Sequence, residues 1–97
     1  MIAILWRYEV PEAHRAAFEA AYGPEGDWAR LFARTPGFGG TELLIGEPGH
    51  YMTIDRWAKA SDFDAFLAAH GDAYRAMDAR CEGWTTSEEK LGVFRVG

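Results

Sequence analysis

Branched and aromatic residues dominate the first stretch of the chain, residues 2–10, and predict a β-strand. One face of this strand carries four large apolar side chains, those of Ile2, Ile4, Trp6 and Tyr8. The opposite face is apolar at Ala3 and Leu5 before it turns polar at Arg7. Neither face at the start of the strand is typical of one that borders water.

Residues 11–35 show helical periodicity with one interruption. Pro11 suits the first turn of a helix, and an apolar stripe follows at helical spacing in His14, Phe18, Ala21 and Tyr22. Gly23 and Pro24 end this helix, and we expect Asp27 to cap a second, shorter one. The second apolar face is formed by Trp28, Leu31 and Phe32. The Pro36-Gly37 pair ends the segment, so the first helix is expected to be broken.

Two strands follow, over residues 39–47 and 50–57, and the tight Glu47-Pro48-Gly49 connection makes them a hairpin. In the second strand of the pair one face carries Tyr51, Thr53, Asp55 and Trp57, and the other carries Met52, Ile54 and Arg56.

The longest helical pattern begins near Ser61, which with Asp64 three residues later resembles a capping box. Its apolar stripe recurs at spacings of three and four in Phe63, Leu67, His70, Tyr74, Met77, Cys81 and Trp84, with Phe66 beside it. Gly71 predicts a kink at Gly71-Asp72, and Gly83 is expected to end the helix. Residues 87–96 then form a fourth strand.

The order of elements is β-α-β-β-α-β, which predicts an α+β fold of the ferredoxin-like type. Such a fold has a four-stranded antiparallel sheet with both helices, the first one broken, on one face. The other face of the sheet would keep apolar residues on several strands, more than a monomer usually exposes. We therefore expect a homodimer that packs sheet to sheet.

The 97 residues are expected to form one domain, residues 1–97. The net charge of −5 argues against a nucleic-acid partner or a polybasic membrane surface. The single Cys81 excludes an internal disulfide, and no stretch approaches the ~20 apolar residues that span a bilayer. A cytoplasmic protein without a membrane partner is the expectation. Aromatic residues make up 14% of the chain, enough for both a core and a pocket for a flat ligand.

Three segments together resemble the antibiotic biosynthesis monooxygenase family of the dimeric α/β-barrel group. They are GDWARLFARTPGFGGTELL, the strand YMTIDRW, and SDFDAFLAAH after it. The most specific marks are the PGF turn into a strand and the Trp that closes the next strand. The resemblance covers nearly the whole chain and implies a homodimer in which two sheets form a barrel. It also implies a pocket between sheet and helices where an aromatic substrate reacts with O2 without metal or flavin.

The resemblance carries over to few individual residues. Trp57 matches the Trp that lies beside the substrate in the quinone-forming members of the family. Thr53, Phe63 and Met77 stand where those members have Asn, Tyr and Arg. Some relatives bind and degrade haem, and their Asn, Trp and His positions correspond here to Arg7, Phe66 and Ala76.

His70, Trp57 and Tyr74 are the candidate catalytic residues, with His70 or a tyrosine as the proton acceptor or donor. The residues expected to line the substrate pocket are Trp6, Tyr8, Trp28, Phe32, Tyr51, Thr53, Phe63 and Phe66. The alternative interpretation of each is an ordinary core residue. Trp28 and Phe32 could also form a movable wall, because glycines flank their segment.

The sequence contains no Gly-rich phosphate loop and no GxSxG element, and its three His residues lack metal-ligand spacing. We therefore expect no metal and no cofactor. Two classes of function remain. One is a cofactor-independent monooxygenase acting on a small aromatic molecule, and the other is a non-catalytic ligand-binding dimer, including a haem-binding or stress-associated one.

Overall fold

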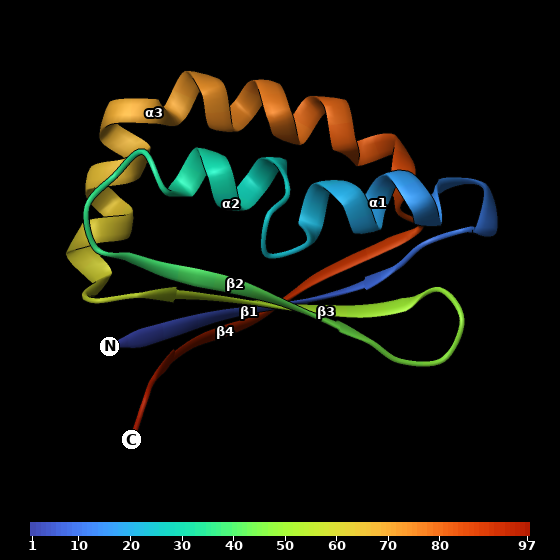
Figure 1. Ribbon diagram of the computed structural model, residues 1–97, viewed down its shortest axis with the longest axis horizontal. Helices are drawn as coiled ribbons and strands as arrows, with labels where there is room; N and C mark the ends of the chain where they lie inside the picture. The colour runs from blue at the N-terminus through green and yellow to red at the C-terminus, as the bar shows by residue number, and fades with distance from the viewer.

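The computed structural model describes residues 1–97 and shows a four-stranded antiparallel sheet with its helices on one face (Figure 1). This arrangement confirms the ferredoxin-like α+β prediction. The strands lie in the order β2-β3-β1-β4. In chain order the elements are β1 (Ile2–Glu9), α1 (Arg15–Tyr22), α2 (Asp27–Phe32), β2 (Phe38–Ile45), β3 (His50–Trp57), α3 (Ala60–Cys81) and β4 (Ser87–Arg95). Short 3-10 turns at Glu12–His14 and Glu82–Trp84 precede α1 and follow α3.

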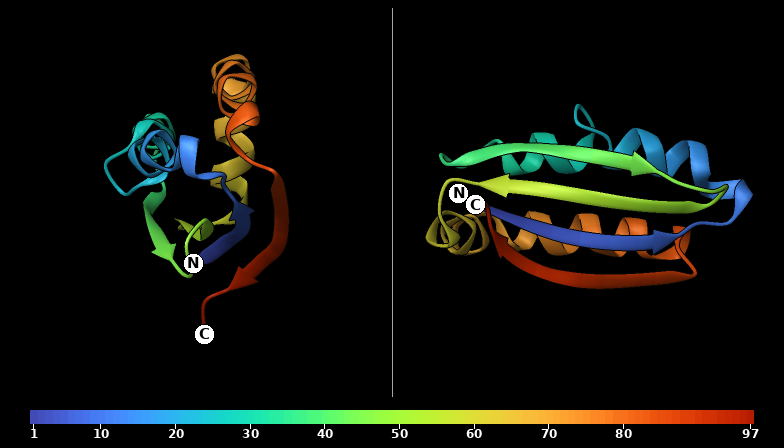
Figure 2. Two further views of the ribbon diagram at one scale, coloured as in Figure 1. Left: turned by 90° about the vertical axis from the view of Figure 1, so that its right-hand side faces the viewer. Right: turned by 90° about the horizontal axis from the view of Figure 1, so that it is seen from below.

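The helices form two rows above the sheet. Figure 2 shows α1 and α2 above the β2 side and α3 above the β4 side. β1 lies inside the sheet, because it pairs antiparallel with both β3 and β4. The helix-covered face of the sheet is therefore the one on which an enclosed site can be built.

A register shift in β4 decides which of its side chains face the helices. Trp6 of β1 lies opposite Lys90 and Leu5 lies opposite Gly92, so Leu91 is an extra residue that has no partner. Gly92 has a positive φ of 147°, a conformation suited to glycine. Because Tyr8 lies opposite Glu88, both Glu88 and Lys90 share the helix-facing side of the sheet.

The core is aromatic and centres on Trp57, which is completely buried. Its indole lies 5.6 Å from the ring of Phe32 and 5.8 Å from that of Phe66, measured between centroids. Phe18 and Phe66 are also completely buried. Burying each such side chain is worth roughly 1.5–3 kcal/mol, so this cluster is a major source of stability.

The break between α1 and α2 falls where the sequence predicted it, but the cap is different. Gly26, not Asp27, is the residue before α2, and no side chain caps that helix. A Cβ at Gly26 would lie 2.5 Å from the backbone oxygen of Ala20, so only glycine fits this close approach. The Asp27 carboxylate instead accepts hydrogen bonds from Arg30 and Arg80, each 2.6 Å long, and so joins α2 to α3.

The start of α3 also differs from the prediction. The helix begins at Ala60, and the Asp62 carboxylate accepts a 3.1 Å hydrogen bond from the Lys59 backbone N–H. The predicted Ser61–Asp64 capping box is therefore wrong, because the helix starts before Ser61 and Asp62 satisfies the free N–H group. The predicted end at Gly83 is wrong too, since the α-helix stops at Cys81 and continues as a 3-10 turn.

α3 bends at His70, whose φ of −127° and ψ of 20° are not helical, one residue before the expected kink. Figure 1 shows the first part rising beside the sheet and the second part running above it. The bend changes which residues of the first part face inward. Phe66 is completely buried, whereas Leu67, expected on the apolar stripe, is 37% exposed.

The face of the sheet without helices carries apolar side chains on several strands. Leu44 of β2 is 43% exposed and Phe94 of β4 is 50% exposed. Met52 and Ile54 of β3 are partly exposed on the same face. None of the helices has the length and apolar character needed to cross a membrane.

Candidate functional site

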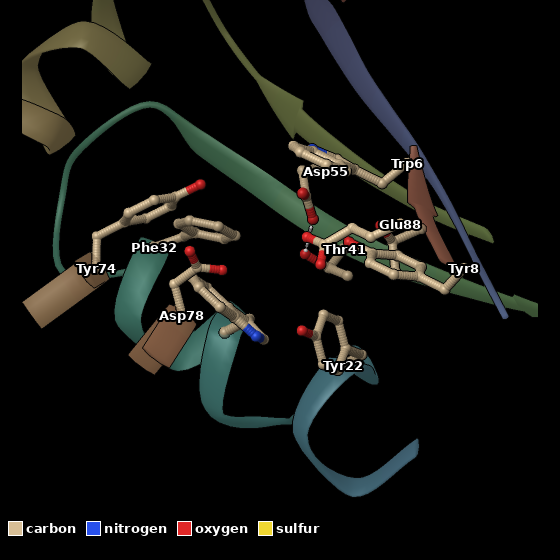
Figure 3. Close-up of a pocket in the computed structure, with 11 residues that line it drawn as sticks. Trp6, Tyr8, Tyr22, Phe32, Thr41, Asp55, Tyr74, Asp78 and Glu88 are labelled. Carbon is tan, nitrogen blue, oxygen red and sulfur yellow. Dashed lines mark hydrogen bonds between the residues drawn. The ribbon is translucent and has the colours of Figure 1, made fainter. Parts of the chain in front are cut away.

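A small cavity of about 40 Å³, partly open to solvent, lies between the sheet and the two rows of helices (Figure 3). All four strands and all three α-helices contribute to its wall. The lining residues are Trp6, Tyr8, Tyr22, Trp28, Phe32, Thr41, Thr53, Asp55, Tyr74, Asp78 and Glu88. A second compartment shares Trp6, Phe32, Asp55 and Tyr74 and adds Ile4, Phe63, Leu67 and Lys90. The two compartments meet at Asp55.

Asp55 is the polar centre of this cleft. It lies on the helix-facing side of β3, where alternation also places Thr53 and Trp57. The Thr41 hydroxyl of β2 donates a 2.6 Å hydrogen bond to its carboxylate, and no basic side chain forms an ion pair with it. Burial raises the pKa of Asp55 to about 6, although the bond from Thr41 acts in the opposite direction. A carboxylate with a pKa in this range can accept a proton from a ligand near neutral pH.

Three tyrosines of the wall remain protonated and can act as hydrogen-bond donors. Burial raises the pKa of both Tyr8 and Tyr22 well above the usual value of a phenol. Burial also raises the pKa of Tyr74, and the nearby carboxylates of Asp78, Glu88 and Asp55 add to that effect. These hydroxyl groups come from β1, α1 and α3, and Figure 3 shows them around one space.

Two further carboxylates, Asp78 and Glu88, lie at the solvent-exposed mouth of the cavity. Partial burial raises the pKa of Glu88, and the negative charge of Asp78 raises it further. No Lys, Arg or His lines this compartment. Lys90, two residues beyond Glu88 on β4, lines the other compartment instead. The cleft therefore has one acidic end and one basic end.

Trp28 offers a hydrogen-bond donor that the protein does not use. Its side chain is 7% exposed and lines the cavity from α2. Its indole Nε1 is buried and forms no hydrogen bond of good geometry, although the Tyr22 hydroxyl and the Cys81 thiol lie near it. A buried N–H group without an acceptor is unfavourable by roughly 1–3 kcal/mol, which a ligand with a suitably placed oxygen would recover.

Six of the residues expected in the site line the cavity, namely Trp6, Tyr8, Trp28, Phe32, Thr53 and Tyr74. Phe63 lines only the second compartment. Four others lie outside both. Trp57 and Phe66 belong to the core. The Tyr51 hydroxyl donates a 2.6 Å hydrogen bond to Glu19. The centroid of the His70 ring lies 5.7 Å from that of Phe66.

Five lining residues were not singled out for the site from the sequence: Tyr22, Thr41, Asp55, Asp78 and Glu88. Asp55 had a visible signal, since it shares the aromatic face of its strand with Tyr51 and Trp57. Asp78 lies one helical turn after Tyr74, and this spacing places the two on one helix face. The position of Thr41 depends on strand register, and that of Glu88 depends on pairing with Tyr8, which the sequence pattern does not reveal.

The fold and the partly open cleft define a small ferredoxin-like protein with a cavity between sheet and helices. The family model of antibiotic biosynthesis monooxygenases matches residues 1–80. The chain therefore belongs to the antibiotic biosynthesis monooxygenase family. A comparison with curated proteins gives no match.

Solved structures show the same fold. The chain is similar to SnoaB, a cofactor-independent oxygenase from Streptomyces nogalater, with 28% identity and a TM-score of 0.73 over 99% of this chain and 92% of that one. Rv0793 from Mycobacterium tuberculosis has 16% identity and a TM-score of 0.68 over 99% and 94%. A point mutant of MhuD, with two manganese protoporphyrin IX molecules per active site, has 22% identity and a TM-score of 0.69 over 99% and 94%.

Proposed function

We propose that this protein is a cofactor-independent monooxygenase that oxidises a phenolic aromatic molecule with O2 in the cleft between sheet and helices. The observation that carries the proposal is the Asp55 carboxylate, which faces an aromatic-walled cavity and has no ion-pair partner. The similarity to SnoaB, a cofactor-independent oxygenase, supports the same class of reaction.

The reaction begins when Asp55 accepts the phenolic proton. The phenolate that results is electron-rich, and its para carbon forms a bond with O2 to give a hydroperoxide. Loss of the hydrogen on that carbon, with cleavage of the O–O bond, gives a quinone and one water. For the simplest case, phenol and O2 give benzoquinone and water, so the substrate supplies all four electrons.

The wall of the cleft supplies the other groups that this chemistry needs. Lys90 borders the second compartment and stabilises the phenolate by charge attraction, which solvent weakens because the Lys90 side chain is exposed. Tyr74 is the proposed proton donor to the leaving oxygen, and Thr53 contacts the substrate between the two compartments.

Trp57 and His70, which lie behind the wall, are proposed positioning residues rather than groups that touch the substrate. Trp57 supports Phe32 of the cavity wall, with ring centroids 5.6 Å apart. His70 contacts Phe66, and the ring of Phe66 lies 5.1 Å from that of Phe32. Both residues therefore act on the cavity through Phe32.

Oxygen uptake with 1-naphthol, 1,5-dihydroxynaphthalene and 9-anthrone tests the proposal. We expect uptake with at least one of these probes and a quinone as the product, with loss of most of the activity in Asp55→Asn. Asp64→Asn is the matched control, because Asp64 is exposed on α3 and lines no cavity. Saturable binding without uptake would favour the non-catalytic ligand-binding alternative, and full activity in Asp55→Asn would contradict the role of Asp55.

We also propose that the chain forms a homodimer through the sheet face without helices. Family membership supports this, since such proteins are typically dimers. The apolar side chains of Leu44, Ile54 and Phe94, exposed or partly exposed on that face, support it as well. Sedimentation at micromolar concentration should show twice the 10.8 kDa chain mass. A single species at the chain mass would refute the dimer, and Phe94→Asp should dissociate it.

The geometry favours the monooxygenase over haem binding. His70, the histidine of α3, lines neither compartment and so is not placed to ligate a haem iron in the cleft. Titration with haem tests this preference. A Soret shift that His70→Ala abolishes would reverse it.

A further inference from the structure

The charge of the main cavity is unusual for a site that has to hold a phenolate. Three carboxylates line it, those of Asp55, Asp78 and Glu88, and no cationic side chain does. None of the three forms an ion pair with a basic residue. Five of the fifteen acids form ion pairs, for example Asp27 with Arg30 and Arg80, and the three cavity acids are not among them. The cavity mouth is therefore a place where negative charge is left uncompensated.

The buried indole of Trp28 is a second and independent sign that a ligand occupies this cavity. Its Nε1–H forms no hydrogen bond of good geometry although the residue is only 7% exposed. The cavity also holds the Tyr22 hydroxyl, whose proton is retained because burial raises the pKa of that group. A ligand oxygen on the helix side of the cavity would give the Trp28 N–H a better acceptor than the neighbouring Tyr22 hydroxyl and Cys81 thiol.

The remaining wall of the cavity is aromatic. Trp6, Tyr8, Tyr74 and Phe32 border the same space as the carboxylates. The negative faces of aromatic rings attract a cation, and Trp and Tyr are effective in this role. Aromatic rings and unpaired carboxylates together make a favourable environment for an organic ammonium group and an unfavourable one for an anion.

The irregular pairing of β4 gives the cleft its polarity. Glu88 and Lys90 lie two residues apart on the helix-facing side of β4, opposite Tyr8 and Trp6 of β1. Glu88 reaches the main cavity and Lys90 reaches the second compartment. Asp55 lies between them, because it lines both compartments. A ligand that matches this pattern has a positive end, a ring at Asp55 and a negative charge developing at Lys90.

We propose that the substrate class is a phenol that carries a protonated amine, with the ammonium group held by Asp78 and Glu88 at the mouth and the phenolic ring beside Asp55. This inference rests on the proposed monooxygenase function for the reaction at the ring. The ammonium contacts themselves require no turnover. An ammonium group at the mouth would balance the negative charge of the carboxylates. The cavity could then hold a phenolate as well.

Three phenols with the same ring and different side-chain charge serve as binding probes, since their side chains occupy the para carbon that the oxidation requires: tyramine (cationic), tyrosol (neutral) and 4-hydroxyphenylacetate (anionic). Binding is measured under nitrogen by calorimetry and by the NMR signal of the Trp28 indole, assigned with Trp28→Phe. Tyramine should bind about tenfold more tightly than tyrosol, which equals about 1.4 kcal/mol, and 4-hydroxyphenylacetate should bind most weakly. The tyramine preference should shrink as salt concentration rises.

The variants Asp78→Asn and Glu88→Gln should each reduce the preference for tyramine and leave tyrosol affinity nearly unchanged. Both side chains are exposed, so the fold should tolerate the changes. Glu82→Gln is the matched control, because Glu82 is exposed near the end of α3 but lines no cavity.

The inference is overturned if the three phenols bind equally, if none shifts the Trp28 signal at millimolar concentration, or if both variants keep the full preference. Its failure is distinct from failure of the monooxygenase proposal. Oxygen uptake with 1-naphthol but no tyramine preference refutes only this inference. Tyramine preference without oxygen uptake by any phenol refutes only the oxidation.

Discussion

Thr41 of β2 donates a 2.6 Å hydrogen bond to the carboxylate of Asp55, its direct partner in β3. The bond joins an edge strand to the interior of the sheet at the wall of the cavity. It holds the one deeply placed carboxylate of the cleft in a fixed direction, toward the space that the helices enclose. It also favours the ionised form of Asp55, while burial favours the protonated form.

The raised pKa of Asp55 should make the stability of this protein depend on pH. Below pH 3.8 the residue is protonated in both the folded and the unfolded chain. Between that value and about 6 the unfolded chain releases the proton and the folded chain keeps it, so stability falls as pH rises through this window. Above the window the destabilisation is complete and amounts to about 3 kcal/mol.

The substitution Asp55→Asn removes this titration. Relative to the natural chain, the variant should gain up to about 3 kcal/mol in free energy of unfolding when the pH is changed from 4 to 7.5. Urea unfolding at the two pH values measures the gain. In Asp64→Asn, the free energy of unfolding should change with pH as it does in the natural chain. A stability difference between Asp55→Asn and the natural chain that does not change with pH would show that Asp55 is not held protonated by burial.

Loss of the Thr41 hydroxyl should shift the titration of Asp55 further upward. In Thr41→Val the ionised carboxylate loses a donor worth about 1.5–3 kcal/mol, so its midpoint should rise by about one pH unit or more. The carboxyl carbon signal of Asp55 in an NMR titration reports the midpoint. Thr41→Ser keeps a hydroxyl and should restore the original value. An unchanged midpoint in Thr41→Val would mean that the bond has little effect in solution.

The order of the strands and helices could be predicted from the sequence because each element carries a local signal. Alternation marks β1 and β3, and glycine with proline marks the end of α1. The exact ends of helices depended on close contacts instead. Gly26 replaces Asp27 before α2 because the backbone of Ala20 comes within 2.5 Å of its Cβ position, a contact that only the folded chain defines.

The site was predictable only in part, for a similar reason. The aromatic wall was visible in the composition and alternation of the strands, so Trp6, Tyr8 and Thr53 were expected. The acidic residues of the site were not expected, because the pairing of Glu88 with Tyr8 and of Thr41 with Asp55 depends on register between distant strands. His70 shares the helical stripe with Tyr74, yet the bend at His70 itself separates it from the cavity.

The Pro-Gly turn before β2 should not tolerate a side chain at Gly37. Its φ is 96°, and its backbone oxygen accepts a 2.7 Å hydrogen bond from the Ala58 N–H. A Cβ on Gly37 would overlap the carboxylate of Asp62, which completes the start of α3. Backbone strain and loss of this contact together should cost about 2–4 kcal/mol in Gly37→Ala.

Chemical unfolding of Gly37→Ala beside Gly83→Ala tests this expectation. Gly83 is exposed, has no positive φ, and a Cβ there would meet no atom within 4 Å. Its variant should stay within about 0.5 kcal/mol of the natural chain. Equal stability of the two variants would mean that the turn can rearrange without disturbing α3.

Two adjacent residues of α3, Phe66 and Leu67, should differ sharply in their contribution to stability. Phe66 is completely buried and its ring lies 5.8 Å from Trp57 and 5.1 Å from Phe32. Phe66→Ala should therefore lower the free energy of unfolding by about 3–5 kcal/mol through the cavity it leaves. Leu67 is 37% exposed, so Leu67→Ala should cost no more than about 1 kcal/mol.

This pair also distinguishes the bent helix from a straight one. A straight helix would place Leu67 on the inward stripe with Tyr74 and would leave Phe66 at its edge. In the bent helix Phe66 packs against Trp57 and Phe32, and Leu67 borders the partly open second compartment. If urea unfolding shows Leu67→Ala to be the more damaging change, α3 is straight in solution. Phe66→Ala should also weaken ligand binding, because Phe66 supports the Phe32 wall of the cavity.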